Sequence, residues 1–408
     1  MIGPRILLWK NKIWEASGSN LGDLAIITAT VDALRREIPD AQIVMLTDDP
    51  AHTETLYEGV TAERFTLSAY FRAVRDADVV VLDGGTLFAD ATSMAVLVNT
   101  SAAFLARCFA TPVALYGVAS GHMRWTSRML VRATLKRVSL AFLRDSESVE
   151  ELTPLAPGTL ELEATGDVAF SLSVPQPFPE REDRVVVAPR RVFHYGNTFL
   201  PFALRRRLGL LPKGYDEKLD RFTSILAELA DHLVSAHGCE VVFLPMYSAI
   251  GPAAGASGYL KKEFSSRDDK VCREIHEKMA RKADARVFIS DRPREVLSLI
   301  ASSRMLVGVP LHSLILAQVA ETPMVGLAYQ GKVTRFMRDA GLARFTIPVD
   351  SMDCALERDD FVSKADACLA EEHALRERLA AENAVVRATV DTPAARIAHL
   401  LRGQSGAS

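Results

Sequence analysis

The sequence predicts an α/β protein with two doubly wound, Rossmann-like domains that face each other across a cleft. Short runs of residues are continuously apolar, as expected of strands that are buried on both faces of a parallel sheet. Longer helical patterns separate these runs, which is the arrangement of βαβ units. The chain has 408 residues, which is long for one hydrophobic core and sufficient for two domains.

The predicted strands recur from one end of the chain to the other. In the first half they are RILLW (5–9), QIVML (42–46), DVVVLDGG (78–85), PVALYG (112–117) and LAFLRD (140–145). In the second half they are RVVVAPRR (184–191), EVVFLP (240–245), RVFIS (286–290), RMLVGVP (304–310) and PMVGLA (323–328). Helices are expected between them, among others over Asp216–His237 and Asp268–Ala283.

A stretch rich in proline and charge, residues 170–183, predicts an interdomain linker. We therefore expect an N-terminal Rossmann-like domain over residues 1–172 and a second one over residues 184–350. Residues 351–408 are expected to form a C-terminal helical segment, which includes a charged amphipathic helix near 369–388. The apolar and basic stretch 199–212 resembles an insertion or a lid over the cleft.

Composition excludes several classes of protein. The formal net charge is −3, so no overall basic field attracts the chain to nucleic acid. The five cysteines are scattered and have no CxxC spacing, which argues against a disulfide framework and a zinc site. The N-terminal apolar run is too short for a secretory signal, and no run reaches membrane-spanning length. We therefore expect a cytoplasmic protein.

Glycines, charges and small hydroxyl residues follow the predicted strands, at the edge where such sheets bind ligands. These positions fall in the motifs NLGD (20–23), VVLDGGTLF (80–88), LRDSES (143–148), TGDVAFSL (165–172), VVVAPRR (185–191), SSRDD (265–269) and the stretch 311–342. Taken in order, the motifs resemble the polysaccharide pyruvyl transferase family.

The resemblance implies a fold of the GT-B type, with the acceptor bound by the N-terminal domain and the donor by the C-terminal domain. It implies transfer of pyruvate from phosphoenolpyruvate onto two hydroxyls of a sugar as a cyclic ketal, during polysaccharide, exopolysaccharide or cell-wall biosynthesis. The acceptor is a sugar of a glycan or of a lipid-linked oligosaccharide. No cofactor is expected, because phosphoenolpyruvate is a co-substrate. The family commonly has an arginine two residues before the motif histidine, where this chain has Pro310.

Phosphoenolpyruvate carries a phosphate and a carboxylate, so its site needs positive charge and backbone N–H groups, which arginines and helix N-termini supply. The expected donor-binding residues are Arg190, Arg191, Ser313, Tyr329, Lys332 and Arg335. His312 is the candidate general acid that protonates the methylene carbon, because histidine titrates near neutrality, and Arg190 is expected to assist catalysis. The alternatives are a hydrogen-bonded structural histidine and a solvated arginine pair.

The expected acceptor-binding residues are Asn20, Asp23, Gly84, Gly85, Arg144 and Asp167. Several of them are equally explained as helix caps or turn residues. Asp268 and Asp269 either bind acceptor hydroxyls or lie at an exposed helix N-terminus, where acidic residues are also favoured. No cluster has metal-ligand spacing, so no obligatory metal is expected.

A basic stripe, Arg124, Arg128, Arg132 and Lys136, recurs every four residues on a predicted helix and is flanked by Trp125. It is either a peripheral contact with the inner face of the membrane or a solvated helix face.

Two other functions remain open. A nucleotide-sugar glycosyltransferase of the same fold commonly has a glutamate seven residues before the proline of its donor helix, where this chain has Leu316. The second alternative is a non-catalytic homologue that binds an anion or acts as a scaffold. An oligomer is compatible with any of these functions.

Overall fold

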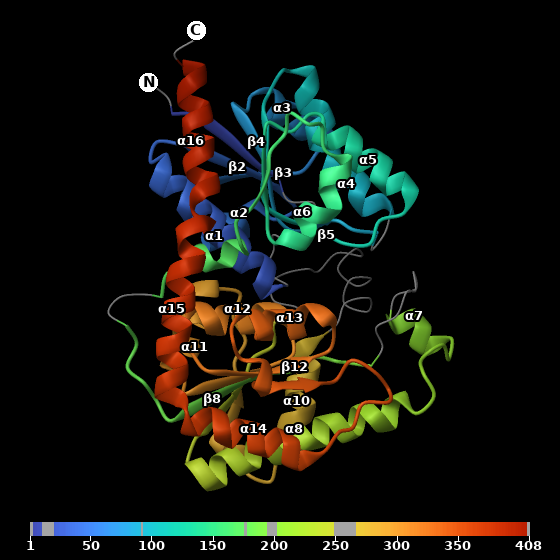
Figure 1. The fold of residues 1–408 in the computed structure, drawn as a ribbon, viewed down its shortest axis with the longest axis vertical. Helices are drawn as coiled ribbons and strands as arrows, with labels where there is room; N and C mark the ends of the chain where they lie inside the picture. Colours follow the sequence, from blue (N-terminus) through green and yellow to red (C-terminus); the bar gives the residue numbers. More distant parts are fainter. Residues whose placement is uncertain are drawn as a thin grey trace. The chain divides into compact units, whose positions relative to one another are not determined.

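The computed structural model describes residues 3–9, 20–90, 93–174, 178–193, 202–248 and 267–405 (Figure 1). Contacts between Cα atoms divide the chain into two compact units. The first unit is Met1–Ser17, Asp23–Leu172 and Val385–Ser408, and the second is Gly18–Gly22 and Ser173–Ala384. Each unit contains one parallel sheet, which confirms the predicted pair of doubly wound α/β folds.

The first unit has a seven-stranded sheet in the order β3-β2-β1-β4-β5-β6-β7. All its strand pairs are parallel, so the chain reverses its winding direction between β1 and β4. The strands are β1 (Arg5–Trp9), β2 (Gln42–Thr47), β3 (Val60–Arg64), β4 (Val79–Phe88), β5 (Val113–Ser120), β6 (Leu140–Leu143) and β7 (Leu162–Ala164).

Helices cover both faces of this sheet (Figure 1). They are α1 (Leu21–Glu37), α2 (Pro50–Leu56), α3 (Leu67–Arg75), α4 (Ser93–Cys108), α5 (Trp125–Leu135), α6 (Ser146–Leu152) and α16 (Thr392–Ser405). The single-turn helices η1 (Thr153–Leu155) and η2 (Val168–Ser171) follow in the same unit. A core forms where buried side chains of α3, α4 and α5, such as Val74, Ala102 and Val131, pack on Leu82 and Leu115 of the sheet. Burial of this apolar surface is the main stabilising contribution to the unit.

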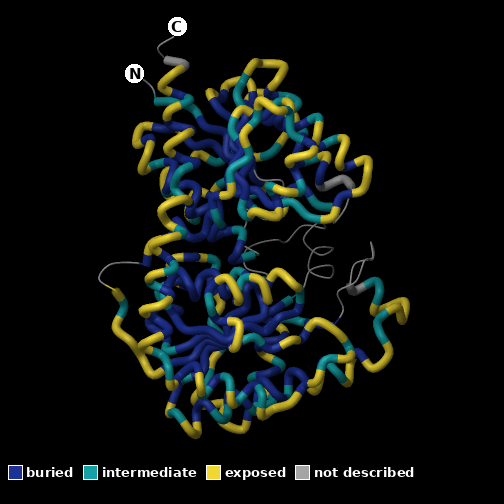
Figure 2. The backbone as a smooth tube through the Cα atoms, viewed as in Figure 1, coloured by how far each residue is buried: buried dark blue, intermediate teal, exposed yellow. Residues whose placement is uncertain are grey.

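The second unit has a six-stranded sheet in the order β10-β9-β8-β11-β12-β13, again entirely parallel. Its winding direction therefore reverses between β8 and β11. The strands are β8 (Arg184–Ala188), β9 (Glu240–Phe243), β10 (Ala285–Val287), β11 (Met305–Gly308), β12 (Met324–Ala328) and β13 (Thr346–Pro348). The neighbouring strands β8, β11 and β12 are buried at every position, as their continuous apolar runs predict (Figure 2).

The helices of the second unit connect these strands. They are α7 (Phe202–Arg207), α8 (Tyr215–His237), α10 (Asp268–Lys278), α11 (Pro293–Ser302), α12 (Leu311–Val319), α13 (Gly331–Asp339) and α14 (Arg358–Ala370), with η3 (Lys282–Asp284) and η4 (Ala343–Phe345). Helix α15 (Glu372–Val390) belongs to the second unit as far as Ala384, and its last residues belong to the first.

The structure corrects some predicted boundaries. The helix expected over Asp268–Ala283 ends at Lys278, and Met279 is extended. It ends there because the Asp231 carboxylate accepts hydrogen bonds from the N–H groups of Ala280 and Arg281, at 2.9 and 2.8 Å. Strands β3, β7 and β13 were not predicted, because each is short and contains polar residues or proline.

Some predicted segments fall partly outside the described residues. These positions are 18–19, directly before the NLGD motif, 175–177 of the linker, 199–201 of the expected lid and 265–266 of the SSRDD motif. Among the described residues, no helix is long and apolar enough to span a bilayer.

Candidate functional site

The residues Arg190 and His312 follow two neighbouring strands of the second sheet. Arg190 comes two residues after the end of β8, and His312 lies in the first turn of α12, which follows β11. Strands β8 and β11 pair directly, with Ala188 opposite Gly308, and the Val309 N–H donates to the Ala188 carbonyl at 2.9 Å. This is the point where the winding direction reverses, at the carboxyl end of the strands. In open α/β sheets, ligands bind there.

The imidazole of His312 packs against the backbone of Gly22. A Cβ atom built on Gly22 would lie 2.5 Å from Nδ1 and 2.6 Å from Cγ of His312. No real side chain fits at such a distance, so this close approach requires glycine. Gly22 therefore determines where the imidazole ring of His312 can lie.

Gly22 is held in position by the rest of the second unit. The Leu21 N–H donates to the Met246 carbonyl at 3.0 Å, and Asn20 forms an antiparallel bridge with Tyr247. The Asn20 Oδ1 atom accepts a hydrogen bond from the Gly22 N–H at 3.2 Å. Asn20, predicted to bind the acceptor, is thus part of the segment that lies against His312.

Arg190 forms a two-point ion pair with Asp268. Its Nη2 atom is 2.8 Å from Oδ2, and its Nε atom is 3.1 and 3.2 Å from the two carboxylate oxygens. Asp268 is fully buried at the start of α10, and its N–H donates to the Tyr247 carbonyl at 3.0 Å. Burial raises the pKa of the Asp268 carboxyl, and the charge and hydrogen bonds of Arg190 oppose that rise. This planar, two-point bond fixes the orientation of the guanidinium.

The other expected donor-binding residues lie at the same edge of the second sheet. Tyr329 follows β12, the neighbour of β11, and the Lys332 Nζ atom lies 5.6 Å from the centre of the Tyr329 ring. Lys332 and Arg335 are exposed on the first turns of α13. Arg191 is half-buried beside Arg190. Ser313 is buried, and its hydroxyl donates to the Pro310 carbonyl at 2.7 Å, so it stabilises the start of α12.

Within the first unit, the structure brings Asp23 close to Gly85, which lies inside β4 and not at its end, where the predicted strand stopped. Gly85 has φ of +101°, which requires glycine, and a Cβ atom there would be 3.9 Å from Oδ1 of Asp23. Gly84 is buried against the Tyr116 and Gly117 carbonyls. These positions lie at the winding reversal of the first sheet, next to β1.

Arg144 and Asp167 also lie near one another in the first unit. The Nη1 atom of Arg144 is 4.0 Å from Oδ2 of Asp167, and its Nε atom is 3.3 Å from Oδ2 of Asp145. Asp167 also caps η2, because its Oδ1 atom accepts from the Ala169 N–H at 3.0 Å. Burial acts to raise the pKa of Asp145, but hydrogen bonds from Ser148 and Arg144 hold it below its usual range.

Sequence reasoning missed two residues that determine the geometry of the site. Gly22 lies inside the recognised NLGD motif, but no pattern in the sequence indicates that it touches His312. Asp268 was considered as an exposed helix-start residue or an acceptor ligand, whereas the structure buries it against Arg190. Asp83, within the recognised VVLDGGTLF motif, is buried in the middle of β4 and accepts a hydrogen bond from the Thr30 hydroxyl at 2.6 Å.

The arrangement in the second unit combines a histidine with a positioned guanidinium, and with further cations on α13. A guanidinium pairs with carboxylate and phosphate groups, and an imidazole gives or takes a proton near neutral pH. The edge is therefore suited to an anionic ligand that reacts by proton transfer.

Comparisons with known proteins show the family and the fold of the chain. The family model described as polysaccharide pyruvyl transferase matches residues 20–331 of the chain. No curated protein matches the chain.

Solved structures with a similar fold include the UDP-GlcNAc 2-epimerase from Neisseria meningitidis bound to UDP-GlcNAc. It is 10% identical, with a TM-score of 0.59, over 98% of this chain and 100% of the epimerase. The sucrose-phosphate synthase from Thermosynechococcus elongatus is 12% identical, with a TM-score of 0.51, over 100% of both chains. The UDP-GlcNAc 2-epimerase from Methanocaldococcus jannaschii is 13% identical, with a TM-score of 0.51, over 90% of this chain and 92% of its own. These likenesses confirm the predicted GT-B-like fold.

Proposed function

The chain belongs to the polysaccharide pyruvyl transferase family, and from this premise we propose that it transfers pyruvate from phosphoenolpyruvate to two hydroxyls of a sugar as a cyclic ketal. The acceptor is a sugar of a glycan or of a lipid-linked glycan precursor. The observation that carries the proposal is the position of His312 and Arg190 after paired strands β8 and β11, at the winding reversal of the second sheet.

In the proposed reaction, protonated His312 donates its proton to the methylene carbon of the enol phosphate. A C–H bond forms there, and the neighbouring carbon gains oxocarbenium character. One sugar hydroxyl attacks that carbon, the C–O bond to phosphate breaks, and the second hydroxyl closes the ketal ring. The two hydroxyl protons balance the reaction, since one replaces the proton that His312 gave and the other leaves with phosphate. Protonation by a positioned acid typically contributes about 10²–10⁴-fold to the rate.

The anionic donor needs a cation where this chain has Pro310 in place of the family arginine. Arg190 is the residue that we propose for that role, because Asp268 holds its guanidinium at two points. Arg191, Lys332 and Arg335 add positive charge at the same edge. In the first unit, we propose that Asp23, Gly84, Gly85, Arg144 and Asp167 bind the acceptor sugar. Asn20, which lies in the second unit in the segment that contains Gly22, remains a predicted acceptor ligand.

Replacing the guanidinium fork of Arg190 tests the proposed donor site. Arg190→Lys keeps the charge and loses the two-point geometry, so we expect the Kd of phosphoenolpyruvate to rise by roughly 10- to 100-fold. Calorimetric titration measures this change. Arg190→Ala is less informative, because removing one partner of a buried pair costs about 3–5 kcal/mol of stability.

The matched control is Arg184→Lys. Arg184 is buried at the opposite end of the same strand, β8, and pairs with Glu240 at 2.7 Å. We expect this variant to bind phosphoenolpyruvate as the wild type does. Equal affinity in Arg190→Lys and wild-type protein would remove Arg190 from the donor site.

The basic stripe of α5 supports a proposed peripheral contact with an anionic membrane. All four of its members, Arg124, Arg128, Arg132 and Lys136, are exposed. Two large apolar side chains lie on the same helix, Trp125 with 74% and Met129 with 63% of its surface exposed. Exposed cations beside exposed apolar groups fit an anionic lipid surface, which suits an acceptor built on a lipid carrier.

Charge reversal tests this contact. Each basic residue near an anionic bilayer contributes about 1 kcal/mol, so Arg128→Glu with Arg132→Glu should weaken vesicle binding by roughly 30-fold or more. Co-sedimentation with phosphatidylglycerol-containing vesicles measures it, and Arg387→Glu with Arg402→Glu is the control at two other exposed arginines. Equal sedimentation of both double variants would leave the stripe as a solvated helix face.

The function itself is tested by incubating the protein with phosphoenolpyruvate and a glycan-lipid extract. Release of inorganic phosphate, with a pyruvate ketal on the glycan detected by mass spectrometry, is the expected result. Turnover without a ketal, or no turnover with any glycan, would contradict it.

A further inference from the structure

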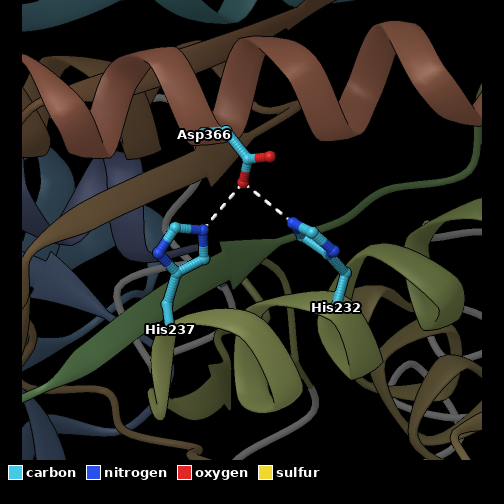
Figure 3. A group of neighbouring side chains, drawn as sticks. All are labelled: His232, His237 and Asp366. Atoms are coloured by element: carbon cyan, nitrogen blue, oxygen red, sulfur yellow. Dashed lines mark hydrogen bonds and ion pairs between the residues drawn. The ribbon is translucent and has the colours of Figure 1, made fainter.

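Two histidines and an aspartate converge on the surface of the second unit, away from the residues discussed above. His232 and His237 come from the last turns of α8, and Asp366 comes from α14 (Figure 3). The Nε2 atom of each histidine is 2.8 Å from the same oxygen, Oδ1 of Asp366. Among the described residues, this is the group of histidine, cysteine and carboxylate side chains whose ligand atoms all lie within 4.8 Å of one another.

The local sequence explains why the two imidazoles can meet one carboxylate. Gly238 has φ of +66° and ends α8 directly after His237, so His237 lies at the end of the helix. His232 lies more than one turn earlier, and the two rings are 5.7 Å apart at an angle of 75°. Helix α14 packs on α8 through Phe361 and Phe222, which brings Asp366 between the two rings.

We propose that His232, His237 and Asp366 form a binding site for a divalent transition metal ion such as Zn²⁺. Two imidazole nitrogens and one carboxylate oxygen are a ligand set that zinc accepts, with a fourth position for water. Metal–ligand bonds of about 2.0–2.2 Å in tetrahedral geometry place ligand atoms about 3.3 Å apart. Each histidine nitrogen thus needs to move about half an ångström away from its present 2.8 Å contact with Asp366, while the two nitrogens, which lie within 4.8 Å of each other, take up the same spacing of about 3.3 Å.

Protonation and access are both compatible with an ion. The Oδ1 atom of Asp366 faces the Nε2 atoms of both histidines, and an aspartate is ordinarily a carboxylate at neutral pH. A neutral imidazole can move its proton to Nδ1 and offer the Nε2 lone pair to a metal. The side chains are 21%, 25% and 41% exposed, so the site is open to solvent on one side and supported by protein on the other.

The proposed ion has a structural role. His237 precedes the start of β9, whereas Arg190 and His312 follow the ends of β8 and β11. Since all the strands are parallel, the three ligands and the proposed catalytic edge lie at opposite ends of the sheet. The ion would cross-link α8 and α14, whose ligands are separated by 129 residues or more in the sequence. Such a link stabilises the folded unit, because the ion binds the native state in preference to the unfolded chain.

The test is metal binding by protein first dialysed against a chelator. Titration with Zn²⁺ is expected to give one tight equivalent, and Co²⁺ is expected to produce the visible absorption band of a tetrahedral site. His232→Gln and Asp366→Asn should each weaken Zn²⁺ binding by much more than about 100-fold, which exceeds the loss of about 10- to 100-fold from an outer-shell partner. His373→Gln, at an exposed histidine of α15, is the control and should bind as the wild type does.

A further variant separates the loss of a metal ligand from a general loss of folding. His232→Cys supplies a thiolate, which is also a zinc ligand, so it should bind Zn²⁺ where His232→Gln does not. The thermal midpoint of wild-type protein should rise with Zn²⁺, and that of Asp366→Asn should not. Zn²⁺ affinity that is the same in wild-type protein, His232→Gln and Asp366→Asn would overturn the proposal, as would the absence of binding by wild-type protein at micromolar concentration.

Discussion

Replacing His312 by alanine is expected to lower kcat by about 10²–10⁴-fold, while phosphoenolpyruvate still binds. The imidazole is the proton donor in the proposed reaction, and the anionic donor is held mainly by Arg190 and its neighbours. Loss of an interaction made only in the transition state lowers kcat without a matching change in ground-state affinity. Phosphate release measures kcat, and calorimetry measures the Kd of phosphoenolpyruvate.

The control for this experiment is His399→Ala, at an exposed histidine of α16 in the first unit. It should leave both constants unchanged. If His312→Ala kept the wild-type kcat and only weakened donor binding, His312 would be a ligand of the anion, and the proton donor would have to be another group.

Replacing Gly22 by alanine is expected to reduce kcat/KM by roughly 100-fold, although the substitution adds a single methyl group. That methyl group would lie 2.5 Å from Nδ1 of His312, so the imidazole must move or the segment 20–22 must withdraw. A displacement of about 1 Å of a catalytic group costs about 100-fold in rate. Activity should fall more steeply than stability, for which such overpacking costs about 1–3 kcal/mol.

The matched control is Gly158→Ala, since a Cβ atom at Gly158 meets nothing within 4 Å. Combining Gly22→Ala with His312→Ala adds a second check. If the glycine acts through the imidazole, its effect on kcat should largely disappear in the His312→Ala background. Full additivity of the two substitutions, or wild-type activity of Gly22→Ala, would show that this contact does not position the acid.

The sequence predicts the sheet architecture well, because buried parallel strands are continuously apolar. VVVA of β8 and MLVG of β11 are fully buried, but the strands end at Ala188 and Gly308, before the last residues of the predicted runs 184–191 and 304–310. The short edge strands β3, β7 and β13 carry no such pattern, so they were missed. The end of α10 was placed too late, because it depends on the Asp231 carboxylate from another helix.

The candidate site could be predicted in its residues but not in its contacts. His312 and Arg190 were found from their positions after strands, since parallel strands bring such positions to one edge. The pairing of Arg190 with Asp268 spans 78 residues, and no periodicity encodes it. The same limit explains why the sequence indicated no metal site, since Asp366 lies 134 residues from His232. Contacts between segments this far apart follow from packing of the whole unit.

Binding of the donor is the most direct test of the proposed function. The fold of this chain is similar to that of UDP-GlcNAc 2-epimerases and of a sucrose-phosphate synthase, so likeness of fold alone does not identify the donor. Calorimetric titration of the wild-type protein with phosphoenolpyruvate, and in parallel with a panel of nucleotide sugars, shows which kind of donor the protein binds. Saturable binding of phosphoenolpyruvate and no binding of the nucleotide sugars is the predicted result. Saturable binding of a nucleotide sugar, with no binding of phosphoenolpyruvate, would contradict the proposed transferase and assign His312 and Arg190 to a different donor.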